Sequence, residues 1–447
     1  MTTIQRVLLI AAMGGLMEAV RSVAVAGSGD RVRAAATVLG IGFVLIVSHL
    51  VGKLFAQIRL PKLTGYLAAG IVSGPAVLAY LDGDVVGDMK LVNGVAIALI
   101  ALTAGSEIDF RAMRPLFRSV AWISAIAVCG TALALSLAAL LLRPFLPFLA
   151  AMPIDATIAV CAVIGVVVVA QSPAVVVAIR SETGADGPVA QTVLAVVVLA
   201  DLLVIVLFAI TSSIATAVIA GSFDAGAALT RLLWELFGSL GIGAMIGVLL
   251  ALWQRAVKRG LDLFVLTVCF VAAEVGQRLH LDPLLMMLAA GMFVENVMHS
   301  GHELRREFEA ASLPVYVLFF TVAGASIHLD AIPTFLVPTA VLVLVRGLGL
   351  LFGTRVAARV ADAPEKVVKW AGFGLLPQAG LAIALALLFA RTFPTFGAEA
   401  GTLVLGIVAI NELVAPALLR WAYVRSGEAE SERTASEATA PPVPATR

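Results

Sequence analysis

Asp201 is the residue of this sequence whose position most needs a chemical explanation. It lies within the apolar run QTVLAVVVLADLLVIVLFAI, about 15 residues after Asp186 and farther from Asp224. An ionisable residue in the middle of such a run is costly to bury and usually marks an ion path or a proton relay. It could also be a structural carboxylate that hydroxyl groups or an arginine satisfy. The chemistry we expect of it is the binding of a proton or a cation.

Arg346 is a second ionisable residue inside an apolar run, FLVPTAVLVLVRGLGLLFGTR. A guanidinium in this setting needs acceptors or an aqueous cavity. Two roles are open, and they are compatible. The side chain could tie two helices together, or it could offset the charge of Asp201 or of interrupted helix ends.

Two apolar runs are interrupted by proline and polar residues. The first reads VVVVAQSPAVVVAIR, with Gln171, Ser172 and Pro173 at its middle. The second reads WAGFGLLPQAGLAIALAL, with Pro377 and Gln378 near its middle. Proline removes a backbone donor and frees a carbonyl one turn earlier. Each interruption could be a kink, but two at matching positions are typical of the discontinuous helices around a transporter's midplane site.

Other polar residues in apolar runs are less informative. Asn411 and Glu412 lie inside the last run, where they are candidates for the border of an ion path. Glu274 and Arg278 are spaced as an interfacial ion pair on one helix face. The 5 histidines and 3 cysteines are scattered, so we expect neither a resident metal site nor a disulfide framework.

The composition requires lipid as the solvent of most of this chain. Of its 447 residues, 61% are hydrophobic and 13% are charged, whereas an ordinary soluble domain carries about 25% charged residues. The net charge of +1 gives no sign of a nucleic-acid partner. No P-loop, nucleophile elbow or HExxH motif is present. We therefore expect no enzyme and no cofactor, and ATP-driven transport would require a separate subunit.

The elements that carry these residues are predicted to be membrane-spanning helices. Apolar runs predict an all-α polytopic membrane protein with about fourteen spans, or thirteen if the weak first span does not cross. The approximate extents are 7–26, 34–52, 63–81, 92–107, 119–142, 156–179, 188–215, 232–253, 261–279, 283–298, 313–327, 334–358, 367–390 and 400–424. The interrupted spans are the sixth and the thirteenth, and the odd offset means that they run in opposite directions. This indicates inverted repeats over about 34–215 and 261–424, with 232–253 as the connector.

The chain divides into three parts. Residues 1–30 hold the weak first span and a loop, 31–425 form the transmembrane domain, and 426–447 form a polar tail that we expect to be disordered. Lys and Arg are about twice as frequent in the loops after even-numbered spans as in the others. The positive-inside rule then places the C-terminus in the cytoplasm. The Ala, Val and Arg content, with no evident cleavable leader, fits a bacterial plasma (inner) membrane.

From about Val38 to Arg425 the sequence resembles the monovalent cation:proton antiporter-2 family of Kef-type exchangers. The resemblance is carried by LPKLTGYLAAGIVSGP, ALTAGSEIDF, AQSPAVVVAIRSE, LADLLVIVLF, LHLDPLLMMLAAGMFVEN, LPVYVLFFTVAGASIHLD, GLLPQAGLAIALAL and INELVAPALLRW, in that order. It implies a Na⁺/H⁺ antiporter-like fold with two crossing discontinuous helices, usually a homodimer. A core domain would move as an elevator against a dimerisation domain.

The resemblance also implies roles for single residues. An aspartate beside the first broken helix binds the cation or the proton in that family, and Asp201 matches it. Ser172 and Pro173 match the unwound stretch. Arg346 falls where the family has a basic residue, and Gln378 lies at the second break.

One residue departs from the family pattern. The position before the aspartate is usually Asp, Asn or Gln, and here it is Ala200. A second carboxylate there generally accompanies transport of net charge, so its absence suggests electroneutral exchange of one proton for one cation. Gln171 stands where the family more often has a small hydroxyl residue, and it could supply the missing polar contact.

The resemblance thus implies a secondary transporter that exchanges Na⁺ or K⁺ for protons across a lipid bilayer. Three alternatives remain open. These are a channel-like cation efflux pathway, a non-transporting sensor or assembly subunit on the same fold, and a transporter of organic ions on a related fold. The sequence does not distinguish Na⁺ from K⁺, nor does it indicate the direction of flux.

Overall fold

Every secondary-structure element in the described part of the chain is a helix, as the apolar runs predicted. The computed structural model describes residues 3–24, 30–58, 60–75, 77–81, 90–106, 108–150, 152–220, 225–256, 261–279, 281–298, 301–326, 335–378, 380–393 and 395–429. The principal helices are α1 (Thr3–Ala24), α2 (Asp30–Gln57), α3 (Lys62–Ser73), α5 (Lys90–Ser106), α7 (Phe117–Ile123), α8 (Gly130–Leu141), α10 (Ile154–Val169), α11 (Pro173–Thr183), α12 (Pro188–Ala220), α13 (Ala225–Ala256), α14 (Leu261–Leu279), α15 (Pro283–Phe293), α16 (Gly301–Ala325), α18 (Leu336–Val360), α19 (Glu365–Gly374), α20 (Gly380–Thr392) and α21 (Gly397–Ser426).

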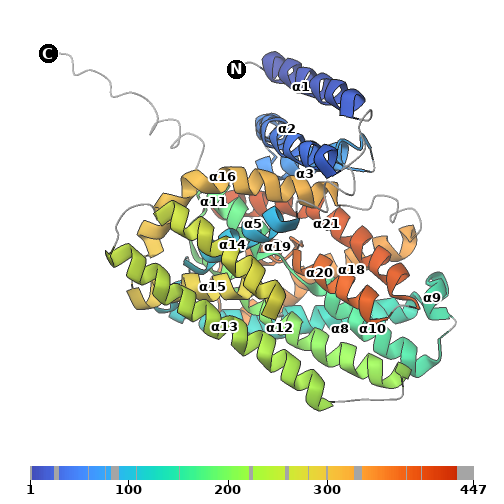
Figure 1. Ribbon diagram of the computed structural model, residues 1–447. Helices are drawn as coiled ribbons and strands as arrows, with labels where there is room; N and C mark the ends of the chain where they lie inside the picture. The colour runs from blue at the N-terminus through green and yellow to red at the C-terminus, as the bar shows by residue number, and fades with distance from the viewer. Residues whose placement is uncertain are drawn as a thin grey trace.

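Seven helical segments of the described chain are long and apolar enough to cross a membrane. They are Leu39–Gln57, Arg114–Leu141, Ile154–Thr183, Pro188–Ile219, Leu233–Ala256, Leu336–Val360 and Gly397–Ser426. Shorter apolar helices within α5, α14, α15 and α16 accompany them. The weak first span corresponds to α1, which is not one of the seven and packs on α2 at one edge of the molecule (Figure 1).

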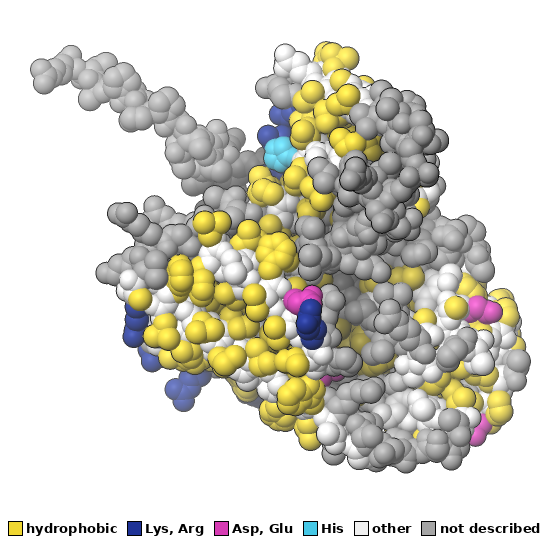
Figure 2. All heavy atoms as spheres, in the orientation of Figure 1, with side chains coloured by type: hydrophobic (Ala, Val, Ile, Leu, Met, Phe, Trp, Pro, Cys, Tyr) yellow, Lys and Arg dark blue, Asp and Glu magenta, His cyan; other side chains and the backbone are white. Residues whose placement is uncertain are grey.

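The outer surface of these helices is apolar. Leu141 is 80% exposed, and Phe117 and Leu263 are also largely uncovered. Figure 2 shows hydrophobic side chains over much of the described surface on one face, with few charged groups among them. Contiguous exposed apolar surface of this kind is rare on a soluble monomer. It fits helices whose outer faces meet lipid.

The helices pack as two bundles. The first bundle contains α8, α10, α12, α18, α19, α20 and α21, which contact one another as a group. The second bundle contains α2, α3, α5, α13, α14, α15 and α16, in which α15 packs between α5 and α13 and α16 packs on α3 and α5. Helix α11 lies where the bundles meet, because it contacts α12 and α21 as well as α5.

Both predicted interruptions are present. Helix α10 ends at Val169 and α11 begins at Pro173, while α19 ends at Gly374 and α20 begins at Gly380. Proline is well suited to the first helical position, because an N–H group there would have no acceptor within the helix. The α10–α11 and α19–α20 pairs occupy matching places in the two halves of the chain, on either side of α13.

The span expected over 119–142 is present as Arg114–Leu141, and a π-helical turn at Ser124–Cys129 separates α7 from α8 within it. The start of the tail differs from the sequence prediction. The tail was expected to begin at residue 426, yet Ser426 and Glu428 are buried. The described chain continues to Ala429, and the Glu428 carboxylate is hydrogen-bonded to the start of α12. Residues 430–447 lie outside the described part.

Candidate functional site

Asp201 projects from α12 into the protein interior. The residue is 4% exposed, and neither carboxylate oxygen has a hydrogen-bond partner among the described residues. A buried carboxylate normally has one. The structure therefore rules out, within the described chain, the reading in which hydroxyl groups or an arginine satisfy this side chain. Its oxygens are open to a proton or a cation.

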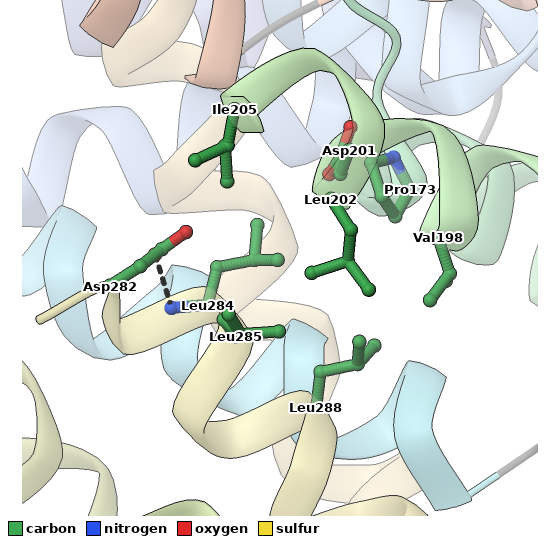
Figure 3. A pocket seen from close by; sticks show the side chains of 9 residues that line it. All are labelled: Pro173, Val198, Asp201, Leu202, Ile205, Asp282, Leu284, Leu285 and Leu288. Carbon is green, nitrogen blue, oxygen red and sulfur yellow. Dashed lines mark hydrogen bonds between the residues drawn. The ribbon is translucent and has the colours of Figure 1, made fainter. Parts of the chain in front are cut away.

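A small pocket adjoins Asp201 at the boundary of the two bundles. It is lined by residues of α11, α12 and α15 together with the residue before α15, namely Pro173, Val198, Asp201, Leu202, Ile205, Asp282, Leu284, Leu285 and Leu288. Figure 3 shows Asp201 beside the ring of Pro173, with the leucines of α15 facing Val198 and Leu202 across the pocket. Apart from the two aspartates the lining is apolar, and the space suits a water-sized guest.

The polar residues of the first break lie at the start of α11. The Ser172 hydroxyl is the N-cap of α11 and accepts a hydrogen bond from the Val175 N–H at 3.3 Å. Gln171 is buried, and its amide oxygen and nitrogen have no partner within the described residues. Because Pro173 is the first residue of α11 and lines the pocket, the positive end of this helix lies near Asp201.

Arg346 is fully buried and binds the ends of both interrupted helices. Its Nε donates to the Val168 carbonyl at 2.8 Å, and one Nη donates to the Ala170 carbonyl at 2.9 Å. The remaining bonds go to the carbonyls of Leu376 at 2.7 Å and Leu375 at 3.5 Å. All four acceptors lie at the C-terminal ends of α10 and α19, where helix dipoles are negative. These hydrogen bonds tie the two interrupted helices together, and they place the positive guanidinium against the negative ends of both helix dipoles.

Gln378 and Asn411 continue this network. The Gln378 amide, at the second break, donates to the Val168 carbonyl at 2.9 Å. This carbonyl of the first break therefore accepts hydrogen bonds from both Gln378 and Arg346. The Asn411 amide of α21 donates to the Gln378 oxygen at 3.0 Å. The two interruptions therefore meet, and Asn411 is hydrogen-bonded at their junction. Pro377, also buried, lies in the same irregular stretch.

Glu412 is one of the sequence candidates that the structure leaves apart from the pocket. It is 1% exposed, and its carboxylate has no partner among the described residues. It does not line the Asp201 pocket. The structure brings five candidates together in two groups: Asp201 with Pro173 at the pocket, and Arg346 with Gln378 and Asn411 at the junction of the breaks. Gln171 and Ser172 directly precede Pro173 but do not line the pocket.

Asp282 is a pocket residue that the sequence analysis did not single out. It precedes Pro283 and is the N-cap of α15, with Oδ1 accepting from the Leu284 N–H at 2.9 Å (Figure 3). An Asp-Pro pair at the start of an apolar run is a readable helix-start signal. Its proximity to Asp201 has no such signal, because it depends on how α12 and α15 pack.

The arrangement can perform one kind of chemistry. A carboxylate without a protein partner can neutralise its charge with a proton or with a monovalent cation, and a pocket this small disfavours both at once. Within the described residues, no three His, Cys, Asp or Glu side chains are grouped as they would be to hold a metal ion.

Comparisons with known proteins show which family and which relative this chain resembles. The family model described as "Sodium/hydrogen exchanger, transmembrane" matches residues 42–425. The chain is also 24% identical over 397 residues to the Na(+)/H(+)-K(+) antiporter GerN of Bacillus cereus, covering 86% of this chain and 95% of that protein.

Two solved structures of the sodium proton antiporter MjNhaP1 from Methanocaldococcus jannaschii share the fold. The structure at pH 8 matches with a TM-score of 0.64 and 18% identity, over 88% of this chain and 99% of that one. The structure from an electron-microscopy map matches with a TM-score of 0.68 and 16% identity, over 88% and 98%. At these identities the likeness concerns the fold alone.

Proposed function

The chain belongs to the sodium/hydrogen exchanger family, and from that premise we propose that it exchanges Na⁺ or K⁺ for protons across a membrane by alternating access. The family is one of transporters rather than enzymes. The observation that carries the proposal is the buried Asp201 carboxylate, which has no hydrogen-bond partner among the described residues and adjoins a small pocket between the bundles.

Exchange follows if Asp201 holds one guest at a time. With a cation bound, the carboxylate is ionised; with a proton bound, it is neutral and the cation leaves. The positive end of α11 near Pro173 favours the ionised state, while the apolar lining favours neutralisation by either guest. Movement of the first bundle against the second, with the pocket open to one side at a time, would then couple the two fluxes.

The junction of the two breaks would serve this cycle as a rigid frame. Arg346, Gln378 and Asn411 bind one another or the same carbonyls, so α10, α18, α19 and α21 are held together at one place. Gln171 and Ser172 are the nearest polar residues along the chain to the start of α11. Their oxygens are proposed to replace part of the cation's water shell.

Replacement of Asp201 by Asn tests the proposal. Asn is nearly isosteric but can neither ionise nor bind a proton at neutral pH, so we expect Asp201→Asn to abolish cation-dependent proton movement. The measurement is proton flux in proteoliposomes that contain a pH dye, with Na⁺, K⁺, Li⁺ or Rb⁺ added in turn. Saturable flux that runs uphill at the expense of an imposed proton gradient would separate a carrier from a channel.

Asp155→Asn is the matched control, because Asp155 is an exposed carboxylate on the first turn of α10. The control should retain exchange, and both variants should elute as monodisperse protein from a sizing column in detergent. Exchange that persists in Asp201→Asn would remove Asp201 from the mechanism.

Further properties belong to the same proposal. Ala200, fully buried, places no carboxylate at the α12 position before Asp201, where the family's second carboxylate accompanies transport of net charge, and this supports electroneutral one-for-one exchange. The loop charges support a cytoplasmic C-terminus in a bacterial plasma membrane. Homodimer assembly rests on the family resemblance. Insensitivity of the initial rate to an imposed membrane potential is the expected sign of electroneutrality.

A further inference from the structure

We propose that Asp282, which lies in the bundle opposite Asp201, is a second carboxylate of the cation path. Its charge attracts the monovalent cation toward Asp201 and sets the apparent affinity for that cation. The inference rests on the proposed function and adds a residue to its site. Asp282 precedes α15 in the second bundle, whereas Asp201 belongs to α12 in the first. The cation pocket is thus built by both bundles.

The placement of the two carboxylates carries the proposal. Both line the pocket, and every other lining side chain is apolar. No Lys or Arg lines it to offset their charge. Asp201 is buried and lacks a partner among the described residues, so the pocket holds an acceptor directed at a guest. Two carboxylates in apolar surroundings make a local negative potential that concentrates cations.

A purely structural role for Asp282 must be weighed against this one. Its Oδ1 caps α15 through the Leu284 N–H at 2.9 Å, and its own N–H donates to the Ser239 hydroxyl of α13 at 3.0 Å. These bonds explain why a polar residue begins the helix. They do not require a charge, because Asn and Ser cap helices about as well as Asp. The cap and the charge can therefore be separated by substitution.

Asp282→Asn keeps the cap and removes the charge. We expect the apparent KM for Na⁺ in proteoliposome exchange to rise roughly threefold to tenfold, as expected for the loss of one nearby charge in apolar surroundings. The maximal rate and the midpoint of thermal unfolding in detergent should change little. Asp282→Glu, which keeps the charge, should remain closer to the unchanged chain in KM than Asp282→Asn. KCl is tested in parallel, since the inference concerns monovalent cations as a class.

Asp109→Asn is the matched control. Asp109 is also an N-cap, of the short helix α6 (Phe110–Met113), where it accepts from the Arg111 N–H at 2.8 Å. It does not line the pocket, so its variant should keep the original KM. Equal KM values for Asp282→Asn and the unchanged chain would overturn the inference and leave Asp282 as a cap.

Asp282→Ser provides a second charge-free cap if Asp282→Asn is not recovered in folded form. Loss of folded protein in both would overturn the inference, because the charge would then be structural. Failure of the proposed function has a different signature, namely no cation-dependent proton flux in the unchanged chain. In that event, stabilisation against heat by NaCl relative to choline chloride still tests Asp282: a weaker effect in Asp282→Asn supports the inference, and an equal effect overturns it.

Discussion

Arg346 shows how a single charged side chain is accommodated inside an apolar bundle. The guanidinium is fully buried, and the four acceptors that the structure gives it are main-chain carbonyls at the ends of α10 and α19. Those carbonyls lost their helical donors when the helices were interrupted. A planar group with several fixed donors matches such a set, whereas an ammonium group concentrates its donors on one atom.

Substitution of Arg346 by Lys should therefore destabilise the protein although the charge is conserved. Lys cannot reach all four carbonyls, and each buried acceptor left unpaired costs about 1–3 kcal/mol. We expect a lower unfolding midpoint in detergent for Arg346→Lys and a larger decrease for Arg346→Gln, measured by thermal unfolding followed on a sizing column. Arg359→Lys, at an exposed position near the end of the same helix, is the control. Similar midpoints for the Arg346 and Arg359 variants would contradict this account.

At the level of single elements, α12 depends on a residue far away in the chain for the start of its helix. The Glu428 carboxylate accepts hydrogen bonds from the N–H groups of Val189 and Ala190, each at 2.8 Å. The Asp186 N–H donates to the Glu428 carbonyl at 3.0 Å. A carboxylate at a helix N-terminus satisfies orphan donors and complements the helix dipole. The helix that carries Asp201 is thus anchored by the residues that follow α21.

The packing of Glu428 against the start of α12 requires a glycine at position 187. Its φ of +150° is unfavourable for other residues, and a Cβ there would lie 2.6 Å from Cδ of Glu428. We expect Glu428→Ala to lower the free energy of unfolding by about 1–2 kcal/mol through loss of the cap. Gly187→Ala should be destabilising in the unchanged chain and less so in combination with Glu428→Ala, because the clash is then relieved. The measurement is a double-mutant cycle of unfolding in detergent.

Glu399→Ala is the control for that cycle. Glu399 is an exposed acidic residue in the first turn of α21. The substitution therefore removes a charge near a helix N-terminus without removing a buried cap. It should change stability little. Strictly additive effects of Gly187→Ala and Glu428→Ala would show that the two residues do not interact.

At the scale of the whole molecule, the pocket lies on the boundary between the two bundles, so relative motion must reshape it. Leu202 of α12 and Leu285 of α15 line it from opposite sides. A second contact at the bundle boundary joins the end of α11 to the start of α3. The Lys62 N–H donates to the two carboxylate oxygens of Glu182 at 2.9 and 3.1 Å. The alternating access proposed above would require these contacts to change during each cycle.

A covalent bridge across the pocket should therefore stop transport. Leu202→Cys with Leu285→Cys, in a background where Cys129, Cys161 and Cys269 are replaced by alanine, can be cross-linked by Hg²⁺. We expect exchange to fall to background after cross-linking and to return after an excess of dithiothreitol. The measurement is the same pH-dye assay before and after each addition.

The pair Val198→Cys and Leu202→Cys is the matched comparison, because both positions line the pocket from α12 alone. A bridge within one helix fills part of the same space but does not join the bundles, so it should inhibit less. Equal inhibition by the two pairs would mean that filling the pocket, rather than preventing bundle motion, blocks exchange.

The residue types and their spacing determined much of this protein. The apolar runs predicted the helices, Pro173 and Pro377 marked both interruptions, and the depth of Asp201 and Arg346 in their runs identified them as buried ionisable groups. These features are local, since hydropathy, a missing backbone N–H and a charge within an apolar run are visible over about 20 residues. The resemblance to a cation:proton antiporter family is likewise confirmed by the match over residues 42–425.

Only the tertiary structure decided which groups meet. Arg346 binds the carbonyls of Val168 and Leu376 rather than Asp201, and Asp282 lines the pocket of Asp201 from the other bundle. Glu428, assigned to a disordered tail, caps the helix that carries Asp201. Hydrogen bonding and charge act over a few ångströms in space, whereas these partners are separated by tens to hundreds of residues along the chain. Their proximity is therefore set by helix packing, which no local pattern encodes.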